Sequence, residues 1–529
     1  MEIVELELDD LTATRMTSDE LYLTRSQAER ISKGALDGRI GLAVDGALAD
    51  PHAKHALAVE LDALLTGPRM GDKLQPQHSF KTIASCQRAK AGAGTGLSFD
   101  RHPPRLMYQA PRGTQDILPE DAPYWTYVED ETRRQARLAN YGEIRTPTFE
   151  ETAVFARGVG AATDIVEKEM YSFDDKGGDS MTLRPEGTAG IVRAYLQRSM
   201  SGRPQPVKLF TLLNAFRYDR PQKGRFRAFH QIDFEAIGET DPLVDAELVG
   251  LQLRLYEALG LRKLSLQLNS IGDARCRPAY VQRLGDYFRQ HLDGLCEDCR
   301  RRLETNPLRL LDEKRPECQA VLDGAPHSAD HLCDPCRGHF EGWLDHLETA
   351  GISYTINPRL VRGLDYYTRS VWEVWPPVQG AQSTVGGGGR YDGLAEQLGG
   401  KPTPGVGFAS GIERIILELK DQGVAVTPQP APCVYFVSMD ERGKRQSFRL
   451  AEMLRAAGIS ADMAFGDRKI GKQLGAADKS GAQWALILGE NELANDSITI
   501  KDLRGGSEQR TITQRDLLKV LEHGHGSTE

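Results

Sequence analysis

The densest group of side chains able to do chemistry is a run of cations that follows an apolar stretch. Five basic residues face a single acid, Asp219, between positions 217 and 227: Arg217, Arg220, Lys223, Arg225 and Arg227. Like charges held this closely repel one another, so the arrangement costs stability unless an anion binds between them. The planar guanidinium group suits phosphate oxygens in particular. The loop predicts a phosphate-binding site, with an ordinary basic hairpin tip as the alternative.

The segment after this loop, residues 227–237, alternates strictly between two kinds of side chain, which predicts a strand. One face is mainly apolar and should lie on the core: Ala228, His230, Ile232, Phe234 and Ala236. The other face carries a cation, an aromatic ring, an amide and two carboxylates: Arg227, Phe229, Gln231, Asp233 and Glu235. A solvated edge strand would alternate in the same way. A phenylalanine among these polar groups favours a functional face.

Two cysteine pairs have the spacing of a metal-binding knuckle, Cys296 with Cys299 and Cys333 with Cys336. Two such pairs can supply the four thiolates of a tetrahedral zinc site. Eight cysteines in a chain of 529 residues are too few for a disulfide scaffold. We expect a structural zinc ion at these four thiols, with four reduced cysteines as the alternative.

From Met107 onward, apolar residues recur at the regular spacings that are typical of helices and strands. Apolar residues three or four apart predict an amphipathic helix over residues 244–259, and alternation predicts a strand over 264–268. A polar, proline-rich stretch over 422–432 separates a final region in which strands and helices alternate. Its predicted order is strand 433–437, helix 442–457, strand 459–463, helix 471–480 and strand 485–488, which indicates a small α/β domain.

Composition bounds the class of protein. The hydrophobic fraction of 40% and charged fraction of 27% are typical of a soluble globular chain, and the length predicts two to four domains. The chain contains no run of eighteen apolar residues, and its acidic start lacks the basic region of a signal peptide. We therefore expect a cytoplasmic protein with no membrane partner. The net charge of −9 argues mildly against indiscriminate coating of nucleic acid, but local basic patches remain compatible with it.

The stretch FRYDRPQKGRFRAFHQIDFE, residues 216–235, resembles motif 2 of the class II aminoacyl-tRNA synthetases, in the form typical of histidine–tRNA ligases. Six further blocks resemble that family in its own order: APRGTQDILPE (110–120), YGEIRTPTFEET (141–152, motif 1), LRPEGTAG (183–190), LVRGLDYYTRSVWE (360–373), GGGGRYDGL (386–394) and GVGFASGIERI (405–415, motif 3).

The resemblance implies an α+β catalytic core with a mixed, mainly antiparallel sheet over residues 107–425. It implies an inserted domain over about 274–345 that clamps the acceptor stem of the tRNA. A C-terminal α/β anticodon-binding domain is expected over 431–525. Motif 1 of this family builds a homodimer interface, so a second copy of the chain is an expected partner.

The implied reaction is ligation of L-histidine to its tRNA through a histidyl-adenylate made from ATP, with Mg²⁺ bridging the outer phosphates. The resemblance assigns Arg217 and Arg362 to the α-phosphate. Arg414 should pack on adenine and reach the γ-phosphate, and Phe229 should stack on the other face of adenine. Arg225 is a further expected ATP contact. These roles fit a reaction catalysed by positioning and by neutralisation of phosphate charge.

Histidine needs acceptors for its ammonium group, for which the resemblance implies Glu186, Thr188 and Gln231. Its imidazole can both donate and accept, so a selective site should pair each ring nitrogen. The residues expected there are Glu235, Tyr366, Tyr367 and Tyr391.

Two basic regions are expected to meet tRNA. In the motif 2 loop, Gln222, Lys223 and Arg225 should contact the acceptor end. In the C-terminal domain, a cationic segment should face the anticodon stem, with a solvated helix face as the alternative: Arg468, Lys469, Lys472 and Lys479. The same segment nearly fits a P-loop, but Gln473 stands where a Mg²⁺-binding Ser or Thr is needed.

Two other interpretations fit part of the sequence pattern. A non-catalytic paralogue, a regulatory subunit of histidine biosynthesis, resembles this core, but it should lack the catalytic arginines and the C-terminal domain. A class II ligase for another amino acid is disfavoured by the blocks RGLDYY and GGGGRYDG. Residues 1–106 lie outside the resemblance. We expect a helical extension of unknown role over 1–66 and a flexible linker over 67–106, unless Met107 is the true initiator.

Overall fold

The computed structural model describes residues 15–17, 20–22, 108–160, 163, 165–377, 384–427, 431–506 and 508–525. Contacts divide the chain into two units, Met1–Met107 and Tyr108–Glu529. In the first unit, β1 (Arg15–Thr17) pairs antiparallel with β2 (Glu20–Tyr22), so these residues are extended where a helical extension was expected. Short runs containing Thr and Tyr favour strands, and sparse apolar spacing does not exclude them. The other predicted helical stretches and the linker over 67–106 lie outside the described residues.

The second unit is built on a mixed, mainly antiparallel sheet, which confirms the predicted fold class. Only its two edge pairs, β10 with β9 and β3 with β7, are parallel. In spatial order the strands are β10 (Thr355–Ile356), β9 (Ser265–Ser270), β11 (Thr368–Trp375), β12 (Gly386–Arg390), β13 (Gly405–Gly411), β8 (Ala228–Ile237), β7 (Val207–Phe216) and β3 (Gly142–Glu143).

Strand β8 confirms the predicted alternation and positions the site. Its apolar side chains lie in the core, where Phe234 stacks between Phe210 and Phe408 with ring centroids 5.5 and 5.0 Å apart. The opposite face carries Gln231, Asp233 and Glu235 in neighbouring register positions toward β13 and β7. The long hairpin of β7 and β8 therefore fixes the spacing of these polar groups along one face.

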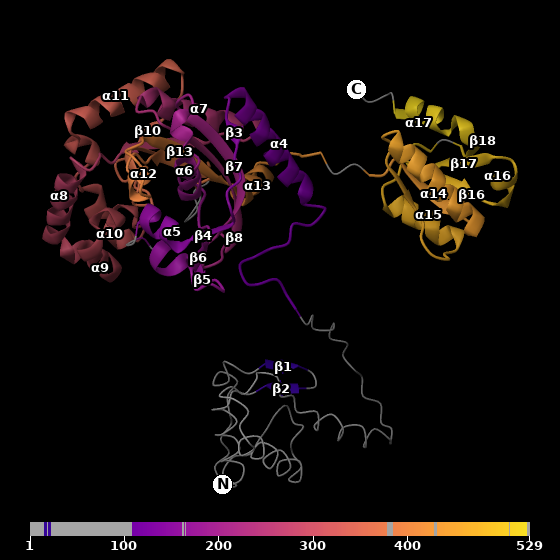
Figure 1. Ribbon diagram of the computed structural model, residues 1–529, viewed down its shortest axis with the longest axis horizontal. Helices are drawn as coiled ribbons and strands as arrows, with labels where there is room; N and C mark the ends of the chain where they lie inside the picture. Colours follow the sequence, from indigo (N-terminus) through magenta and orange to yellow (C-terminus); the bar gives the residue numbers. More distant parts are fainter. Residues whose placement is uncertain are drawn as a thin grey trace, which may run out of the picture. The chain divides into compact units, whose positions relative to one another are not determined.

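Four helices cover the core face: α4 (Ala122–Leu138), α7 (Pro242–Ala258), α11 (Asp334–Thr349) and α13 (Ile412–Asp421) (Figure 1). Helix α7 confirms the predicted helix, and its predicted apolar positions are buried, but its buried surface is wider than predicted because it contacts α4, α11 and β13. Its buried polar residues are hydrogen-bonded, as Gln252 accepts from Trp372 Nε1 at 2.7 Å. None of the described helices is long and apolar enough to cross a bilayer.

Shorter elements lie around the other face of the sheet and between strands. They are α5 (Thr152–Val159), α6 (Thr188–Gln197), α12 (Leu394–Gln397) and a small antiparallel sheet of β4 (Phe149–Glu151), β6 (Ser180–Leu183) and β5 (Tyr171–Asp174). Between β9 and α11 the chain forms α8 (Arg277–Gln290), α9 (Glu297–Thr305) and α10 (Pro316–Asp323), which share a separate apolar core around Leu284, Phe288 and Leu310.

The C-terminal region forms its own sheet, in the order β15-β14-β16-β17-β18. The five predicted elements are confirmed to within two residues as β14 (Val434–Ser438), α14 (Glu441–Ala456), β15 (Ala461–Met463), α15 (Ile470–Lys479) and β16 (Trp484–Leu488). The chain continues beyond the prediction with α16 (Glu490–Ala494), β17 (Ser497–Asp502), β18 (Arg510–Thr513) and α17 (Leu517–His525).

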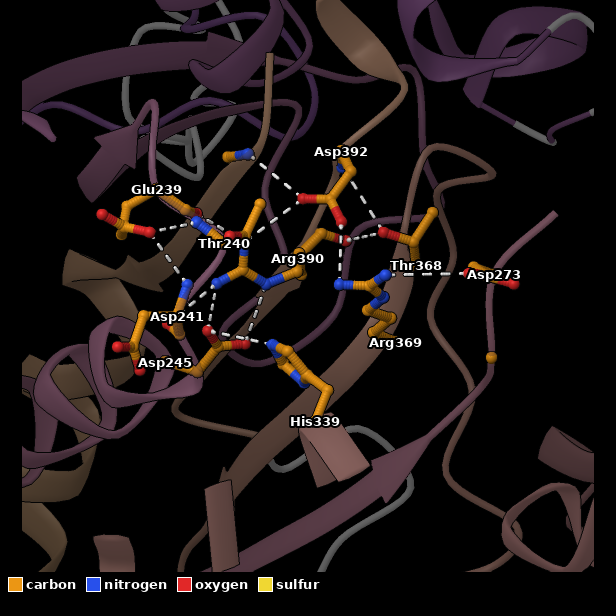
Figure 2. Close-up of polar contacts among 12 residues, drawn as sticks. Glu239, Thr240, Asp241, Asp245, Asp273, His339, Thr368, Arg369, Arg390 and Asp392 are labelled. Atoms are coloured by element: carbon orange, nitrogen blue, oxygen red, sulfur yellow. Dashed lines mark hydrogen bonds and ion pairs between the residues drawn. The ribbon is translucent and has the colours of Figure 1, made fainter. Parts of the chain in front are cut away.

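A buried ion network joins four elements behind the glycine-rich strand (Figure 2). Arg390 at the end of β12 has no exposed side-chain surface and forms a two-point pair with the equally buried Asp245 of α7. Asp392 contacts both Arg390, at 3.2 Å, and Arg369 of β11, at 3.9 Å. His339 of α11 lies 3.8 Å from Asp245, and burial lowers the pKa of this histidine to about 4. The network ties β11, β12, α7 and α11 together.

Because Arg390 cannot reach water, we expect Asp245→Ala to lower the free energy of unfolding by about 3–5 kcal/mol. The measurement is urea unfolding followed by the fluorescence of Trp343 and Trp372, which lie in the same core. Glu247→Ala is the matched control on the same helix, since its 2.6 Å pair with Lys208 is partly exposed and should contribute less than about 1 kcal/mol. Equal losses in the two variants would contradict the assignment.

Candidate active site

A cavity of about 1150 Å³ lies over the polar face of β8 and collects residues from distant parts of the sequence. The three predicted catalytic arginines, Arg217, Arg362 and Arg414, all line it. So do the predicted histidine-contacting residues other than Glu235: Glu186, Thr188, Gln231, Tyr366, Tyr367 and Tyr391. Residues of the inserted helices and turns form part of the wall, including Arg309 and Asp312.

Arg217 stands at the end of β7, where the chain leaves the sheet for the basic loop. Its Nε donates to the carbonyl oxygen of Pro185 at 2.8 Å, and its guanidinium lies 5.4 Å from the ring centre of Phe229. Burial lowers its pKa, against the opposing charges of Glu169 and Glu186. Arg217 is thus a buried cation held in place by a backbone carbonyl, beside an aromatic ring that also lines the cavity.

Arg414 enters from the first turn of α13. Its Nε donates to the carbonyl oxygen of Gly224 at 3.2 Å and its Nη1 to that of Thr384 at 2.8 Å. Burial lowers its pKa, and the nearby charges of Arg225 and Arg217 lower it further. The repulsion inferred from the sequence is therefore present around this residue. An anion bound among these guanidinium groups would relieve it.

Arg362 reaches the cavity from the segment before β11. It pairs with Glu373, whose other oxygen accepts from Trp375 Nε1 at 2.8 Å and from Thr384 Oγ1 at 2.9 Å. Burial opposes the charged form of Arg362, but Glu373 and Tyr367 raise its pKa overall. Arg362 is thus a fixed cation already balanced by one carboxylate, unlike Arg414. Glu373 is the last residue of the block 360–373, but no role was predicted for it from the sequence.

Three other cations of the loop, Lys223, Arg225 and Arg227, lie in different surroundings. Arg225 lines the cavity and pairs with Asp219. Lys223 lies outside at the exposed hairpin tip, 3.1 Å from Asp421. Arg227 was predicted on the polar face of the strand, which is wrong. Its guanidinium lies 3.8 Å from the ring centre of Tyr218, and its backbone N–H donates to Gly113, because β8 begins only at the next residue.

A chain of hydrogen bonds forms the opposite end of the cavity. Glu186 accepts from the backbone N–H groups of Thr188 and Ala189, both at 2.8 Å, where α6 begins. The Thr188 hydroxyl donates to Glu235 Oε1 at 2.6 Å, and the Tyr391 hydroxyl donates to Glu235 Oε2. Burial raises the pKa of both Glu186 and Glu235. Two buried carboxylates so placed favour a ligand that brings positive charge or N–H donors.

Three tyrosines complete this end. Tyr366 lies 4.7 Å from Tyr367 and 5.9 Å from Tyr391 between ring centres. Strand β12 passes close to Tyr367, because a Cβ added to Gly389 would come within 2.6 Å of that ring. The glycine run therefore allows close packing around the pocket.

Asp233 is a buried carboxylate for which the sequence pattern predicted no role. Its side chain lines the cavity, is 1% exposed, and has no hydrogen-bond partner for either carboxylate oxygen among the residues that the structure describes. Burial and the nearby charge of Glu186 raise its pKa to about 8. Gln231 Oε1 is likewise buried without a partner in the described part of the chain. The alternation of β8 was the available signal, since it puts Asp233 between Gln231 and Glu235.

The cysteines do not form the predicted site. Cys333 and Cys336 lie with Asp273 and Cys276, whereas Cys296 and Cys299 lie with Cys318. In each group the possible ligand atoms are within 4.8 Å of one another. The single four-thiol grouping is wrong because the first pair begins α9, the second begins α11, and each helix meets a different partner segment. Neither cluster includes a residue of the cavity wall.

Comparisons with known proteins agree with this architecture. The sequence profile described as histidyl-tRNA synthetase matches residues 113–276 and 311–415, and that of an anticodon binding domain matches 433–523.

A histidine–tRNA ligase of Dehalococcoides mccartyi is 53% identical over 412 residues, covering 78% of this chain and 98% of that relative. One from Pelotomaculum thermopropionicum is 50% identical over 416 residues, covering 79% and 98%. The crystal structure of apo S. aureus histidyl-tRNA synthetase matches with a TM-score of 0.66 at 39% identity, covering 79% of this chain and all of that one.

Proposed function

This chain belongs to the histidyl-tRNA synthetase family, and from that premise we propose that its cavity joins histidine to ATP and passes the activated histidine to tRNA. The proposal rests on one cavity. Arg217, Arg362 and Arg414, from three separate segments, line it together, and its other end is formed by buried carboxylates and tyrosines. Cations at one end suit a triphosphate, and the other end suits a small cationic amino acid.

In the first step the carboxylate oxygen of histidine attacks the α-phosphorus of ATP. The bond from that phosphorus to the bridging oxygen breaks, and pyrophosphate leaves with the electron pair. Arg217 and Arg362 hold the α-phosphate oxygens, and Arg414 reaches the γ-phosphate and packs on adenine opposite Phe229. Mg²⁺ enters with ATP as part of the substrate. In the second step a terminal hydroxyl of the tRNA attacks the histidyl carbonyl, and AMP leaves. The protein supplies position and fixed charge.

Histidine lies with its ammonium group toward Glu186, Asp233 and Gln231. The unpaired oxygens of Asp233 and Gln231 support this placement, because buried acceptors without partners are costly until a donor arrives. The imidazole lies over Glu235, with the tyrosine hydroxyls as second partners for the ring. Since both oxygens of Glu235 already accept hydroxyl protons, its remaining acceptor positions are fixed in direction. Selectivity for histidine follows from this fixed pairing.

Asp233 gives the reaction an expected pH dependence. With a pKa of about 8, its carboxyl is mostly protonated at pH 7 in the free protein, and it must lose that proton to pair with an ammonium group. We expect the KM for histidine to fall as the pH rises from 7.0 toward 8, by a factor approaching ten per unit. Asp233→Asn should flatten this slope. The measurement is histidine-dependent ATP–pyrophosphate exchange across that range, and an identical slope in the variant would exclude the role.

The proposed function is tested by ATP–pyrophosphate exchange with each of the twenty amino acids in turn, followed by charging of histidine tRNA. Exchange should depend on histidine alone, and labelled histidine should become acid-precipitable with its tRNA. Exchange with another amino acid would assign a different ligase. No exchange at all would favour the non-catalytic paralogue, although three arginines in the cavity and a complete C-terminal domain argue against that alternative.

The C-terminal domain is proposed to bind the anticodon arm through the segment before and along α15. Arg468, Lys469, Lys472 and Lys479 are all exposed, and Phe465 beside them is 69% exposed. Cations near an exposed aromatic ring suit a phosphate backbone with an unstacked base. Gln473, which stands where a P-loop needs Ser or Thr, is buried and has a structural role. Its side chain hydrogen-bonds to the backbone N–H and carbonyl groups of Ser438. At the other end of the tRNA, we propose that the exposed residues Gln222 and Lys223, together with Arg225, contact the acceptor strand.

We also propose that the enzyme is a homodimer through motif 1 and acts in the cytoplasm, where tRNA is charged for translation. Strand β3 is an edge of the main sheet, and two apolar side chains close to it in the sequence, Leu138 before it and Phe149 after it, are 70% and 52% exposed. Exposed apolar groups at a sheet edge suit an interface. Light scattering after gel filtration should give twice the mass of one chain, 58.5 kDa, and a monomer would contradict the proposal.

A further inference from the structure

The two ends of the inserted helices meet at a cluster of sulfur and oxygen atoms that the reaction does not use. Asp273 and Cys276 lie between β9 and α8, where the insertion begins. Cys333 and Cys336 lie at the start of α11, where it ends. Their ligand atoms are all within 4.8 Å of one another, although the two pairs are far apart in the sequence. Cys336 has no exposed surface and Cys276 is 7% exposed.

The geometry of this cluster fits tetrahedral zinc. Asp273 Oδ1 lies 3.7 Å from the sulfur of Cys276 and 3.9 Å from that of Cys333. With Zn–S near 2.3 Å and Zn–O near 2.0 Å, a tetrahedral ion sets its sulfur and oxygen ligands about 3.5 Å apart. The observed spacing needs only a small contraction. Gly272, with φ of +67°, makes the approach possible, because a Cβ there would come within 2.6 Å of the Cys276 sulfur.

Partial or full positive charge lies beside several of these ligands. Cys276 and Cys333 are the residues immediately before α8 and α11, where the helix dipole stabilises negative charge. The second oxygen of Asp273 accepts from Arg275 Nη2 at 2.8 Å and lies 3.8 Å from Arg369 Nη2 (Figure 2). Oδ2 is thus held by arginine side chains, whereas Oδ1 accepts from the backbone N–H of Arg275 at 3.0 Å and lies beside the thiols. Metal-binding carboxylates are commonly oriented by such outer partners.

We propose that Asp273, Cys276, Cys333 and Cys336 bind one structural zinc ion that fastens the two ends of the insertion together. The site also bears on the histidine pocket. Arg277, next to Cys276, donates to the carbonyl oxygen of Tyr367 and, at 3.2 Å, to that of Ile271. Arg369 joins the same aspartate to the buried ion network around Arg390. The zinc ion therefore stabilises the wall of the histidine pocket and does not contact the reacting atoms.

The test is the zinc content of the purified full-length chain, measured by mass spectrometry after removal of loosely bound metal. Cys276→Ser should lower the content by one zinc per chain relative to the unmodified protein. Cys433→Ser, which removes a buried thiol of the C-terminal domain, should leave it unchanged. Unmodified protein without stoichiometric zinc, or full retention in Cys276→Ser, would overturn the proposal.

A second variant keeps the test decisive if Cys276→Ser does not fold. Cys318→Ser disrupts the other cluster, that of Cys296, Cys299 and Cys318, and leaves the proposed ligands intact. This variant should retain one zinc per chain. Its X-ray absorption spectrum should fit three sulfur neighbours near 2.3 Å and one oxygen near 2.0–2.2 Å. Loss of all zinc in Cys318→Ser, or a shell of four sulfurs, would overturn the assignment.

Discussion

Arg217→Ala should lower the turnover number for histidine-dependent ATP–pyrophosphate exchange by at least about 10³-fold. Arg217 is buried, held by the Pro185 carbonyl, and proposed to contact the α-phosphate at which charge develops during attack. Water cannot replace a fixed cation in a site of this kind without reorganising. Because the contact strengthens in the transition state, the loss should appear mainly in the turnover number and less in the KM for ATP.

Two variants make this result specific. Arg217→Lys keeps the charge but loses the planar fork, so it should recover only part of the activity. Arg134→Ala removes an exposed arginine of α4 that pairs with Glu131, and it should exchange at the normal rate. A rate for Arg217→Ala within tenfold of the unmodified enzyme, with its fold intact, would remove Arg217 from the catalytic role.

Glu235→Gln should raise the KM for histidine about 10²–10³-fold and leave the KM for ATP nearly unchanged. Glu235 is 1% exposed and accepts hydroxyl protons from Thr188 and Tyr391, two residues that line the cavity, and it is the proposed partner of the imidazole. An amide of the same shape brings N–H donors where only acceptors are tolerated. The imidazole would then lose a charge-assisted partner in a pocket from which water is largely excluded.

Glu247→Gln on α7 is the matched control, because its carboxylate is partly exposed and pairs with Lys208 away from the cavity. Tyr391→Phe should have an intermediate effect of about tenfold, since it frees one acceptor position of Glu235 without removing the carboxylate. If Glu235→Gln and Glu247→Gln gave the same KM for histidine, Glu235 could not be the imidazole partner.

The sequence predicted the parts of this site that are determined locally. Strict alternation over β8 correctly separated Phe234 in the core from Gln231 and Asp233 in the cavity wall, because a strand has a fixed period of two. The basic loop correctly predicted repulsion between cations, because the charges of Arg225 and Arg217 lower the pKa of Arg414. The convergence of Arg217, Arg362 and Arg414 was expected from a family resemblance. No local pattern could place them together, since they come from three segments.

What the sequence missed depends on long-range packing. The cysteine spacing was read correctly as pairs, but which pairs meet depends on where α9 and α11 lie, and Asp273 and Cys276 carry no paired spacing. The buried surface of α7 is wider than predicted, because apolar spacing on one side of a helix does not reveal that another helix, here α11, covers a further side. The unpaired state of Asp233 was equally invisible, because it is set by which donors the neighbouring strands do not offer.

The most direct test of the central claim is a crystal structure of this chain with histidine and an ATP analogue whose α,β-bridge cannot break. We expect nitrogen atoms of Arg217 and Arg362 within about 3.2 Å of the α-phosphate oxygens, Arg414 at the γ-phosphate, and the imidazole on Glu235. A triphosphate bound elsewhere, with Arg217 and Arg414 still directed only at Pro185, Gly224 and Thr384, would contradict it.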